Sequence, residues 1–112
     1  MLIALLDEPV LFVFETTNAA LREIEPPDAE NEIRALFDDQ AVPYKIEWSA
    51  PNRRRNSLFG LLRSVEFGSY RFVPSGPPDP QALRELLEAY PDCDPPESKG
   101  LLDELLRRLH AA

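Results

Sequence analysis

The side chains best suited to nucleophilic catalysis are poorly placed in this sequence. Cys93 is the one cysteine and His110 is the one histidine. A thiol nucleophile needs a nearby base that takes up its proton, but His110 stands two residues before the last residue, where a chain end frays. No motif typical of a nucleophile surrounds Cys93. We therefore expect that the protein is not an enzyme.

The acidic residues do not have the spacing of a metal site. Asp92, Asp94 and Glu97 lack the central glycine and terminal glutamate of a calcium loop, and prolines interrupt them. Such acids are typical of a helix start after a proline-rich stop, and the pair Asp38–Asp39 is typical of a turn. The four glycines form no phosphate-binding motif. We expect neither a metal nor a cofactor.

Arg53, Arg54 and Arg55 form a run of three basic residues in a chain of net charge −8. We expect this run in a loop between two strands. A charge run is usually a solvated surface, but arginine also binds the carboxylates of a protein partner. A further interpretation is binding of RNA or single-stranded DNA, with bases stacked on nearby aromatics such as Trp48. The alternating aromatics also fit a sheet core, and no motif of RNA-binding sheets is present.

Charge is distributed unevenly along the chain. Residues 1–40 carry ten acids and two bases, residues 41–74 two acids and six bases, and residues 75–112 eight acids and four bases. An acidic protein is repelled by nucleic acid at long range and is steered towards basic proteins. We therefore predict a protein-binding module whose acidic surface binds a basic partner such as a nuclease. The candidate contact residues are Glu30, Glu32, Asp38 and Asp39.

The N-terminal half alternates between strand and helix patterns. The run Val10–Phe14 predicts a buried strand, and Thr16 or Thr17 can cap a short helix that ends before Pro26–Pro27. Residues 29–37 fit either a helix or a strand. A turn at residues 38–41 then leads into a half-buried strand in which Tyr44, Ile46 and Trp48 alternate with polar residues.

Residues 63–73 have the alternation of a strand, but its parity changes at Gly68. Leu58–Leu62 precedes this segment. A bulge at Gly68–Ser69 would restore the register, whereas a tight Gly-Ser turn would make a hairpin that pairs Glu66 with Arg71. We favour the hairpin.

Two helices are predicted after the sheet. Asp79 and Pro80 mark the start of the first, whose apolar face is Leu83, Leu86, Leu87 and Tyr90. Residues 1–90 are expected to form one domain, followed in residues 91–112 by a proline linker and an amphipathic helix. The leucines of that last helix either dock on the sheet or form a dimer surface within residues 98–110.

The segments Asp28-Ala29-Glu30-Asn31 and Phe37-Asp38, with the surrounding order of elements, resemble a group of small bacterial proteins of unassigned function. Some of these proteins are of the immunity type, which neutralises toxins. The resemblance covers residues 10–90 and favours a strand over residues 30–37. It implies protein binding and transfers no catalytic residue.

These patterns together predict an α+β fold with a mainly antiparallel sheet of four or five strands, helices on one face and a C-terminal helix. A small barrel of the Sm or SH3 kind is the alternative. The single cysteine excludes an intrachain disulfide and suits a reducing compartment. Met1–Leu6 is too short for a membrane span and lacks the basic residues of a signal peptide. We therefore expect a soluble cytoplasmic protein.

Overall fold

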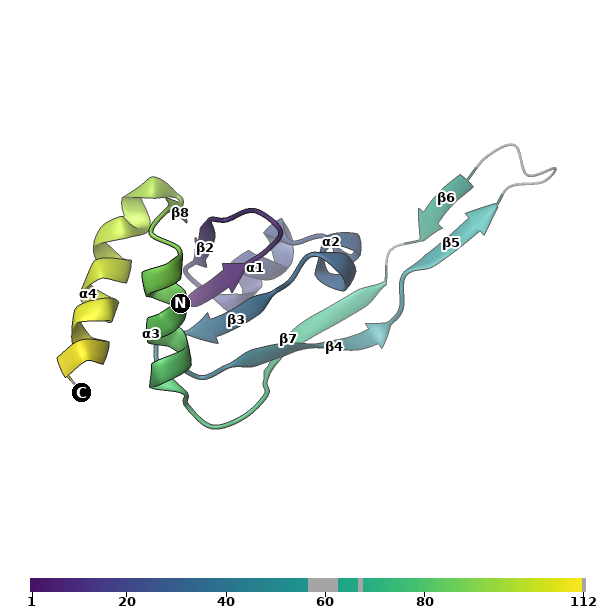
Figure 1. Cartoon of the computed structure of the whole chain (residues 1–112). Coiled ribbons are helices and arrows are strands. Elements are labelled where there is room, and N and C mark those ends of the chain that lie inside the picture. The colour runs from purple at the N-terminus through teal and green to yellow at the C-terminus, as the bar shows by residue number, and fades with distance from the viewer. Residues whose placement is uncertain (57–62, 67, 112) are drawn as a thin grey trace.

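The computed structural model describes residues 1–56, 63–66 and 68–111, and the side chains of residues 1–52 and 68–111 (Figure 1). The elements are, in chain order, β1 (Leu2–Leu5), β2 (Leu11–Phe14), α1 (Thr17–Glu23), α2 (Pro26–Asn31), β3 (Ala35–Asp38), β4 (Tyr44–Ala50), β5 (Arg53–Asn56), β6 (Arg63–Glu66), β7 (Ser69–Pro74), α3 (Pro80–Ala89), β8 (Cys93–Asp94), a 3₁₀ helix (Pro96–Ser98) and α4 (Lys99–Ala111). The α+β prediction is confirmed. The described strands do not close into a barrel, so that alternative is wrong.

One of the two inner strands of the main sheet is β1, which the sequence patterns do not predict. The sheet has the order β3–β1–β2–β8, with β1 antiparallel to both neighbours and β8 parallel to β2. All four residues of β1 are buried. A short run that is apolar on both faces has no alternation to reveal it as a strand.

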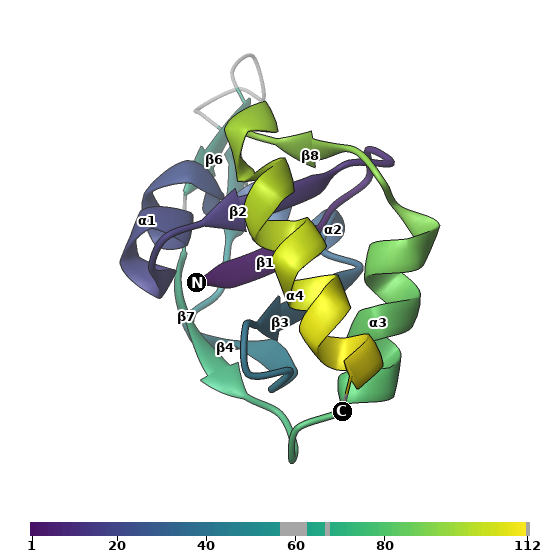
Figure 2. The same ribbon diagram turned by 90° about the vertical axis from the view of Figure 1, so that its left-hand side faces the viewer.

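Helices pack on both faces of this sheet and not on one face as the sequence patterns predict. Figure 2 shows α3 and α4 side by side in front of one face. Their buried leucines are Leu83, Leu87, Leu102 and Leu105, and they form one core cluster with Ile3, Leu5, Leu11 and Val13. The other face carries Leu2 and Ala4 and packs against α1, α2 and Phe72 of β7. The main sheet is therefore buried between two apolar layers.

The segment that fitted either helix or strand contains both. Thr16 caps α1 as predicted, because its hydroxyl accepts a hydrogen bond from the backbone N–H of Ala19 at 3.0 Å. Pro26 does not simply end a helix but begins α2, since proline suits the first turn of a helix. The chain then extends as a strand only from Ala35. The preference for a strand over residues 30–37 is therefore wrong for Glu30 and Asn31.

The predicted hairpin at Gly68 is wrong. β7 pairs with β4, and β6 pairs with β5, so Arg71 lies opposite Glu47 and Glu66 lies opposite Arg53. The change of inward and outward alternation at Gly68 is accommodated by a register shift between Trp48 and Ala50 on β4, the partner strand of β7. The bulge that we considered as the alternative is closer to this arrangement. Leu58–Leu62 lies outside the described residues.

The proline-rich stretch after α3 takes part in the sheet. Asp79 caps α3 as predicted, by accepting a hydrogen bond from the backbone N–H of Ala82 at 3.1 Å. Cys93 and Asp94 form β8, and the backbone N–H of Leu11 donates to the carbonyl of Asp92 at 3.0 Å. The chain then enters α4, which packs on the sheet beside α3.

The molecule is elongated, because β5 and β6 extend away from the body (Figure 1). Its dimensions are 62 × 27 × 20 Å and its radius of gyration is 16.4 Å, against about 13 Å for a compact chain of this length. We call residues 53–66 the β5–β6 arm.

No helix among the described residues has the length and apolarity needed to cross a bilayer.

Candidate binding surfaces

The arginine run lies in a strand and not in a loop, contrary to prediction. Arg53, Arg54 and Arg55 open β5, and their backbone pairs with Glu66, Val65 and Ser64 of β6. The β5–β6 arm carries four arginines and one glutamate, whereas the rest of the chain carries eight bases and nineteen acids, a net charge of −11. The fold therefore separates a basic arm from an acidic body.

Asn52 joins the root of this arm to the body. Its side-chain amide donates to the carbonyl of Pro26 at 3.0 Å and to the Glu30 carboxylate at 2.6 Å. Its carbonyl oxygen accepts from the backbone N–H of Gly68 at 2.8 Å. One side chain thus fastens both strands of the ribbon to α2, and Glu30, a predicted contact residue, takes part in this junction.

The aromatic side chains of β4 and β7 pack against one another and against the body. The ring centroids of Trp48 and Tyr70 are 5.4 Å apart, and those of Tyr70 and Phe72 are 5.5 Å apart at an interplanar angle of 83°. Trp48 is half-buried, and Phe72 is buried in the core that includes Ile24. Trp48 therefore has part of its ring surface occupied by Tyr70.

The Tyr70 hydroxyl donates a hydrogen bond to the carbonyl of Ile24 at the end of α1. Burial, with a smaller contribution from the charge of Asp28, raises the pKa of Tyr70 from 10.0 to about 12. Because the folded pKa lies above the unfolded one, this group stabilises the fold fully below pH 10 and ceases to do so between pH 10 and about 12.

We expect the Tyr70→Phe variant to lose a tyrosinate absorbance change near pH 12 and to show weaker alkaline destabilisation in urea titrations.

Asp38 and Asp39 act mainly within the molecule. Asp38 Oδ1 accepts hydrogen bonds from the backbone N–H groups of Gln40 and Val42 at 2.8 and 3.0 Å, and its Oδ2 accepts from the Tyr44 hydroxyl at 3.1 Å. Asp39 Oδ1 lies 3.8 Å from the N-terminal amine of Met1. The predicted turn at residues 38–41 is therefore confirmed. Both carboxylate oxygens of Asp38 accept hydrogen bonds within this region.

The four predicted contact residues do not form one surface. Glu30 and Glu32 lie before β3 and Asp38 and Asp39 at its end, so the strand separates the two pairs. Of the four, Glu32 is the one that belongs to a further acidic group. Burial raises its pKa, and the charges of Asp28, Asp7 and Glu8 raise it further.

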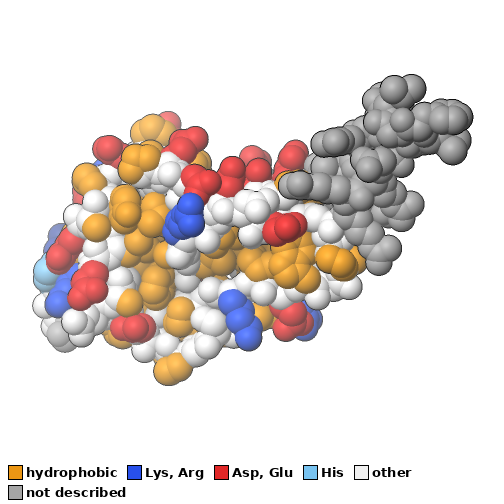
Figure 3. All heavy atoms as spheres, turned by 45° about the vertical axis from the view of Figure 1, so that its right-hand side comes forward, with side chains coloured by type: hydrophobic (Ala, Val, Ile, Leu, Met, Phe, Trp, Pro, Cys, Tyr) orange, Lys and Arg blue, Asp and Glu red, His pale blue; other side chains and the backbone are white. Residues whose placement is uncertain are grey.

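We call Asp7, Glu8, Asp28 and Glu32 the α2 acidic surface. Arg34 partly neutralises it, through an ion pair with Asp7 in which nitrogen and oxygen are 2.6 Å apart. Figure 3 shows acidic side chains gathered along the edge of the body that leads to the arm. Asp7 and Glu8 follow β1 in the chain, and pairing of β3 with β1 brings them to the start of β3, since the Arg34 N–H donates to the Leu5 carbonyl at 2.8 Å.

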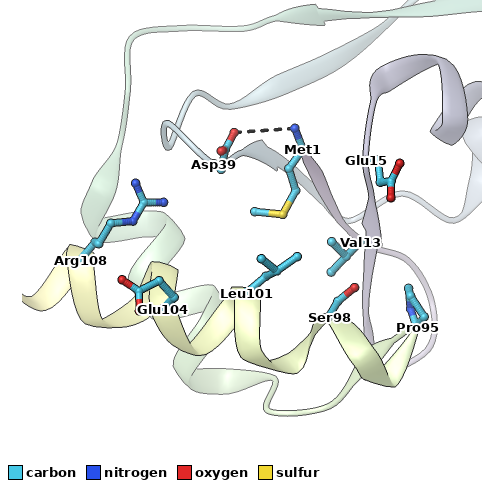
Figure 4. A pocket seen from close by; sticks show the side chains of 9 residues that line it. All are labelled: Met1, Val13, Glu15, Asp39, Pro95, Ser98, Leu101, Glu104 and Arg108. Atoms are coloured by element: carbon cyan, nitrogen blue, oxygen red, sulfur yellow. Dashed lines mark ion pairs between the residues drawn. The ribbon is translucent and has the colours of Figure 1, made fainter.

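A hollow of about 430 Å³ lies between α4 and the end of the main sheet at which β1 begins and β2 and β3 end (Figure 4). Met1, Val13 and Leu101 point into it, and Pro95 and Ser98 close one end. Charged side chains surround this apolar floor, and they are Glu15, Asp39, Glu104 and Arg108. Leu101 is 58% exposed, the one large apolar side chain so exposed among the residues with described side chains.

Cys93 and His110 serve separate parts of the structure. Cys93 is half-buried in β8, where burial raises the pKa of its thiol, an effect that Lys99 partly opposes. His110 Nε2 lies 2.9 Å from the Glu88 carboxylate and so bridges α4 to α3. A raised thiol pKa disfavours the thiolate that a nucleophile needs. Within the described part of the chain no group of His, Cys, Asp and Glu side chains could hold a metal ion.

The sequence patterns miss Asn52, Asp7 and Glu8. Asn52 stands between Pro51 and the arginine run, where turn chemistry explains it without any contact to α2. Asp7 and Glu8 read as the polar end of an apolar run, and the antiparallel pairing of β1 with β3 is a long-range property that local patterns do not contain. Comparison with protein-family models, with curated proteins and with solved structures finds no match for this chain.

Proposed function

We propose that this protein is a non-catalytic binding module of the immunity or inhibitor type, which neutralises a basic protein with its α2 acidic surface. The observation that carries the proposal is the cluster of Asp7, Glu8, Asp28 and Glu32 on an acidic body. Burial raises the pKa of Glu32 and the charges of Asp28, Asp7 and Glu8 raise it further, and a cationic partner would relieve the repulsion among these acids. The resemblance to small bacterial immunity-type proteins supports the same role.

The separation of charge in the molecule supports this choice of surface. The β5–β6 arm removes four arginines from the body, so they offset its negative potential less than they would at the surface of the sheet. Electrostatic attraction of this kind accelerates association and selects the partner more than it adds affinity. A basic nuclease is the kind of partner that fits.

Reversal of two charges tests this proposal. Glu8→Lys combined with Glu32→Lys removes negative charge from the α2 acidic surface, whereas Glu85→Lys combined with Glu97→Lys makes the same net change at exposed sites elsewhere. We expect the first variant to bind a panel of purified basic nucleases about ten-fold or more weakly than wild type by surface plasmon resonance. The control variant should lose much less affinity. Equal losses in the two variants, or no binding by wild type, would contradict the proposal.

The β5–β6 arm supports a second candidate function, which is binding of single-stranded nucleic acid. The backbone of β5 and β6, to which its four arginines belong, lies away from the acidic body, and this arrangement weakens the long-range repulsion of phosphates. Trp48 belongs to β4, which precedes the arm in the chain, and it is packed against Tyr70, so any stacking on it uses only part of its ring. Binding of RNA that weakens steeply with salt and requires Arg53, Arg54 and Arg55 would favour this candidate over the first.

A further inference from the structure

A second hollow, of about 300 Å³, opens beside the turn that joins β1 to β2. Four of the residues that line it are apolar, and they are Leu5, Leu6, Pro9 and Tyr90. Leu5 is buried, whereas Leu6 and Tyr90 are half-buried. Tyr90 also packs against the core cluster that α3, α4 and the main sheet share. The hollow therefore has apolar walls that the fold holds in place.

The other residues that line the hollow are charged, and two of them belong to the α2 acidic surface. Asp7 and Glu8 contribute carboxylates, and Arg34 contributes a guanidinium group. A hydrogen bond of 2.8 Å from the backbone N–H of Val10 to the carbonyl of Glu8 closes the turn that carries the two acids. The hollow thus combines apolar walls with carboxylates, within the surface on which the proposed function rests.

Arg34 already places a guanidinium group against Asp7. Nη2 of Arg34 lies 2.6 Å from Oδ1 of Asp7, and the two side chains are 61% and 46% exposed. An ion pair this exposed contributes little to stability, because water solvates the separated groups well. Asp7 therefore accepts a guanidinium group in this structure, and the guanidinium group of a partner can displace Arg34 at little cost.

The charge around the hollow stays negative in spite of Arg34. The α2 acidic surface holds four carboxylates, and Arg34 pairs with one of them. The remaining acids attract the cation of a partner, whereas Arg34 repels it. Arg34 therefore opposes the binding that the surface otherwise favours.

Arginine fits this hollow better than lysine does. A guanidinium group is planar, binds carboxylates through a rigid fork and packs on aromatic rings, whereas the lysine ammonium is a compact and strongly hydrated charge. The stem of an arginine side chain is apolar, and Leu6, Pro9 and Tyr90 provide apolar walls for it. Asp7 and Glu8 then meet the charged end.

We propose that this hollow binds an arginine side chain of the basic partner and that Arg34 competes with that side chain for Asp7. The inference rests on the proposed function, because the partner is the same. It adds the type of residue that the partner presents and a residue of this chain that limits the affinity. Arg34 is thus an autoinhibitory contact, and its removal should strengthen binding.

A titration with single amino-acid derivatives tests the hollow without any nuclease. The probes are N-acetyl-arginine amide and N-acetyl-lysine amide, which carry the same charge, and amide chemical shifts of the isotope-labelled protein report where they bind. We expect the arginine derivative to shift the amides of Leu6, Asp7, Glu8 and Tyr90 and to bind about three-fold or more tightly than the lysine derivative. No saturable shift at these residues, or equal binding of the two probes, would overturn the proposal.

Arg34→Gln removes the competing charge, and Arg71→Gln is its matched control. Arg71 pairs with Glu47, and these side chains are 69% and 47% exposed, so each substitution removes one exposed arginine ion pair and one positive charge. We expect Arg34→Gln to lower the Kd of the arginine derivative about three-fold or more and Arg71→Gln to change it much less. Arg34→Lys keeps the charge and should stay close to wild type. Circular dichroism checks the fold of each variant, and equal Kd values for Arg34→Gln and Arg71→Gln would contradict the competition.

The same variants separate this inference from the proposed function. In surface plasmon resonance with the basic nuclease that binds wild type best, Arg34→Gln should again bind about three-fold or more tightly than wild type. If Glu8→Lys combined with Glu32→Lys loses the nuclease while Arg34→Gln binds it as wild type does, the acidic surface is the interface and the arginine site is wrong. If the arginine derivative binds in the hollow but no nuclease binds, the proposed function fails and the arginine site stands.

Discussion

Leu105→Ala is expected to lower the free energy of unfolding by about 3 kcal/mol, since a buried leucine loses both its transfer free energy and its packing. Leu105 is 2% exposed and lies in the core cluster that α3, α4 and the main sheet share. The loss of this side chain leaves a cavity between α4 and the sheet. Urea denaturation followed by circular dichroism measures the effect.

Leu101→Ala is the matched control on the same helix. Leu101 is 58% exposed, so the same change should cost less than about 0.5 kcal/mol. A large contrast between the two variants means that α4 docks on its own sheet through Leu102 and Leu105. If both variants lowered the free energy of unfolding by equal and small amounts, α4 would not be docked on the sheet. Its leucines would then be available for a dimer surface, which is the alternative considered from the sequence.

Gly68→Ala is expected to destabilise the protein by about 2 kcal/mol or more, because the added Cβ atom would clash with the backbone that passes close to Gly68. A Cβ atom at Gly68 would lie 2.1 Å from the carbonyl oxygen of Ala50, 2.6 Å from the carbonyl carbon of Pro51 and 2.8 Å from the backbone nitrogen of Asn52. None of these atoms belongs to a side chain that can move away. The ribbon would have to open at the root of the arm, and the hydrogen bond from the Gly68 N–H to Asn52 would be lost.

Gly100→Ala separates this local conflict from the general effect of replacing glycine. Nothing lies within 4 Å of a Cβ atom at Gly100, which is in the first turn of α4. Alanine is the better helix former there, so we expect stabilisation of up to about 1 kcal/mol. Thermal unfolding of both variants measures the two signs. An unchanged melting temperature for Gly68→Ala would contradict the close approach at the arm root.

Elements with a strong local signal could be predicted from the sequence. Thr16 and Asp79 cap the helices that follow them, and β4 shows the predicted alternation of half-buried and exposed residues. Elements that depend on distant partners could not. β8 is two residues long and forms a strand because it pairs with β2. β6 pairs with β5 and does not form a hairpin with β7 at Gly68, so the local Gly-Ser signal does not determine its partner.

The candidate site divides in the same way. The acidic character of the surface follows from residue types alone, but the assignment of each acid depends on its tertiary partners. Asp38 accepts hydrogen bonds within a turn, Asp39 lies close to the N-terminal amine and Glu30 accepts a hydrogen bond from Asn52. Asp7 and Glu8, in contrast, lie beside Glu32 only because β1 pairs with β3. Local patterns contain none of these partners.

The proposed function requires that the α2 acidic surface, and not the arm, contacts a basic protein partner. Its most direct test is a map of amide chemical-shift changes, recorded by nuclear magnetic resonance while the isotope-labelled protein is titrated with the basic nuclease that binds it best. We predict that the largest changes fall on Asp7, Glu8, Asp28 and Glu32 and their neighbours. Changes confined to β5 and β6, with the α2 acidic surface unaffected, would contradict the account.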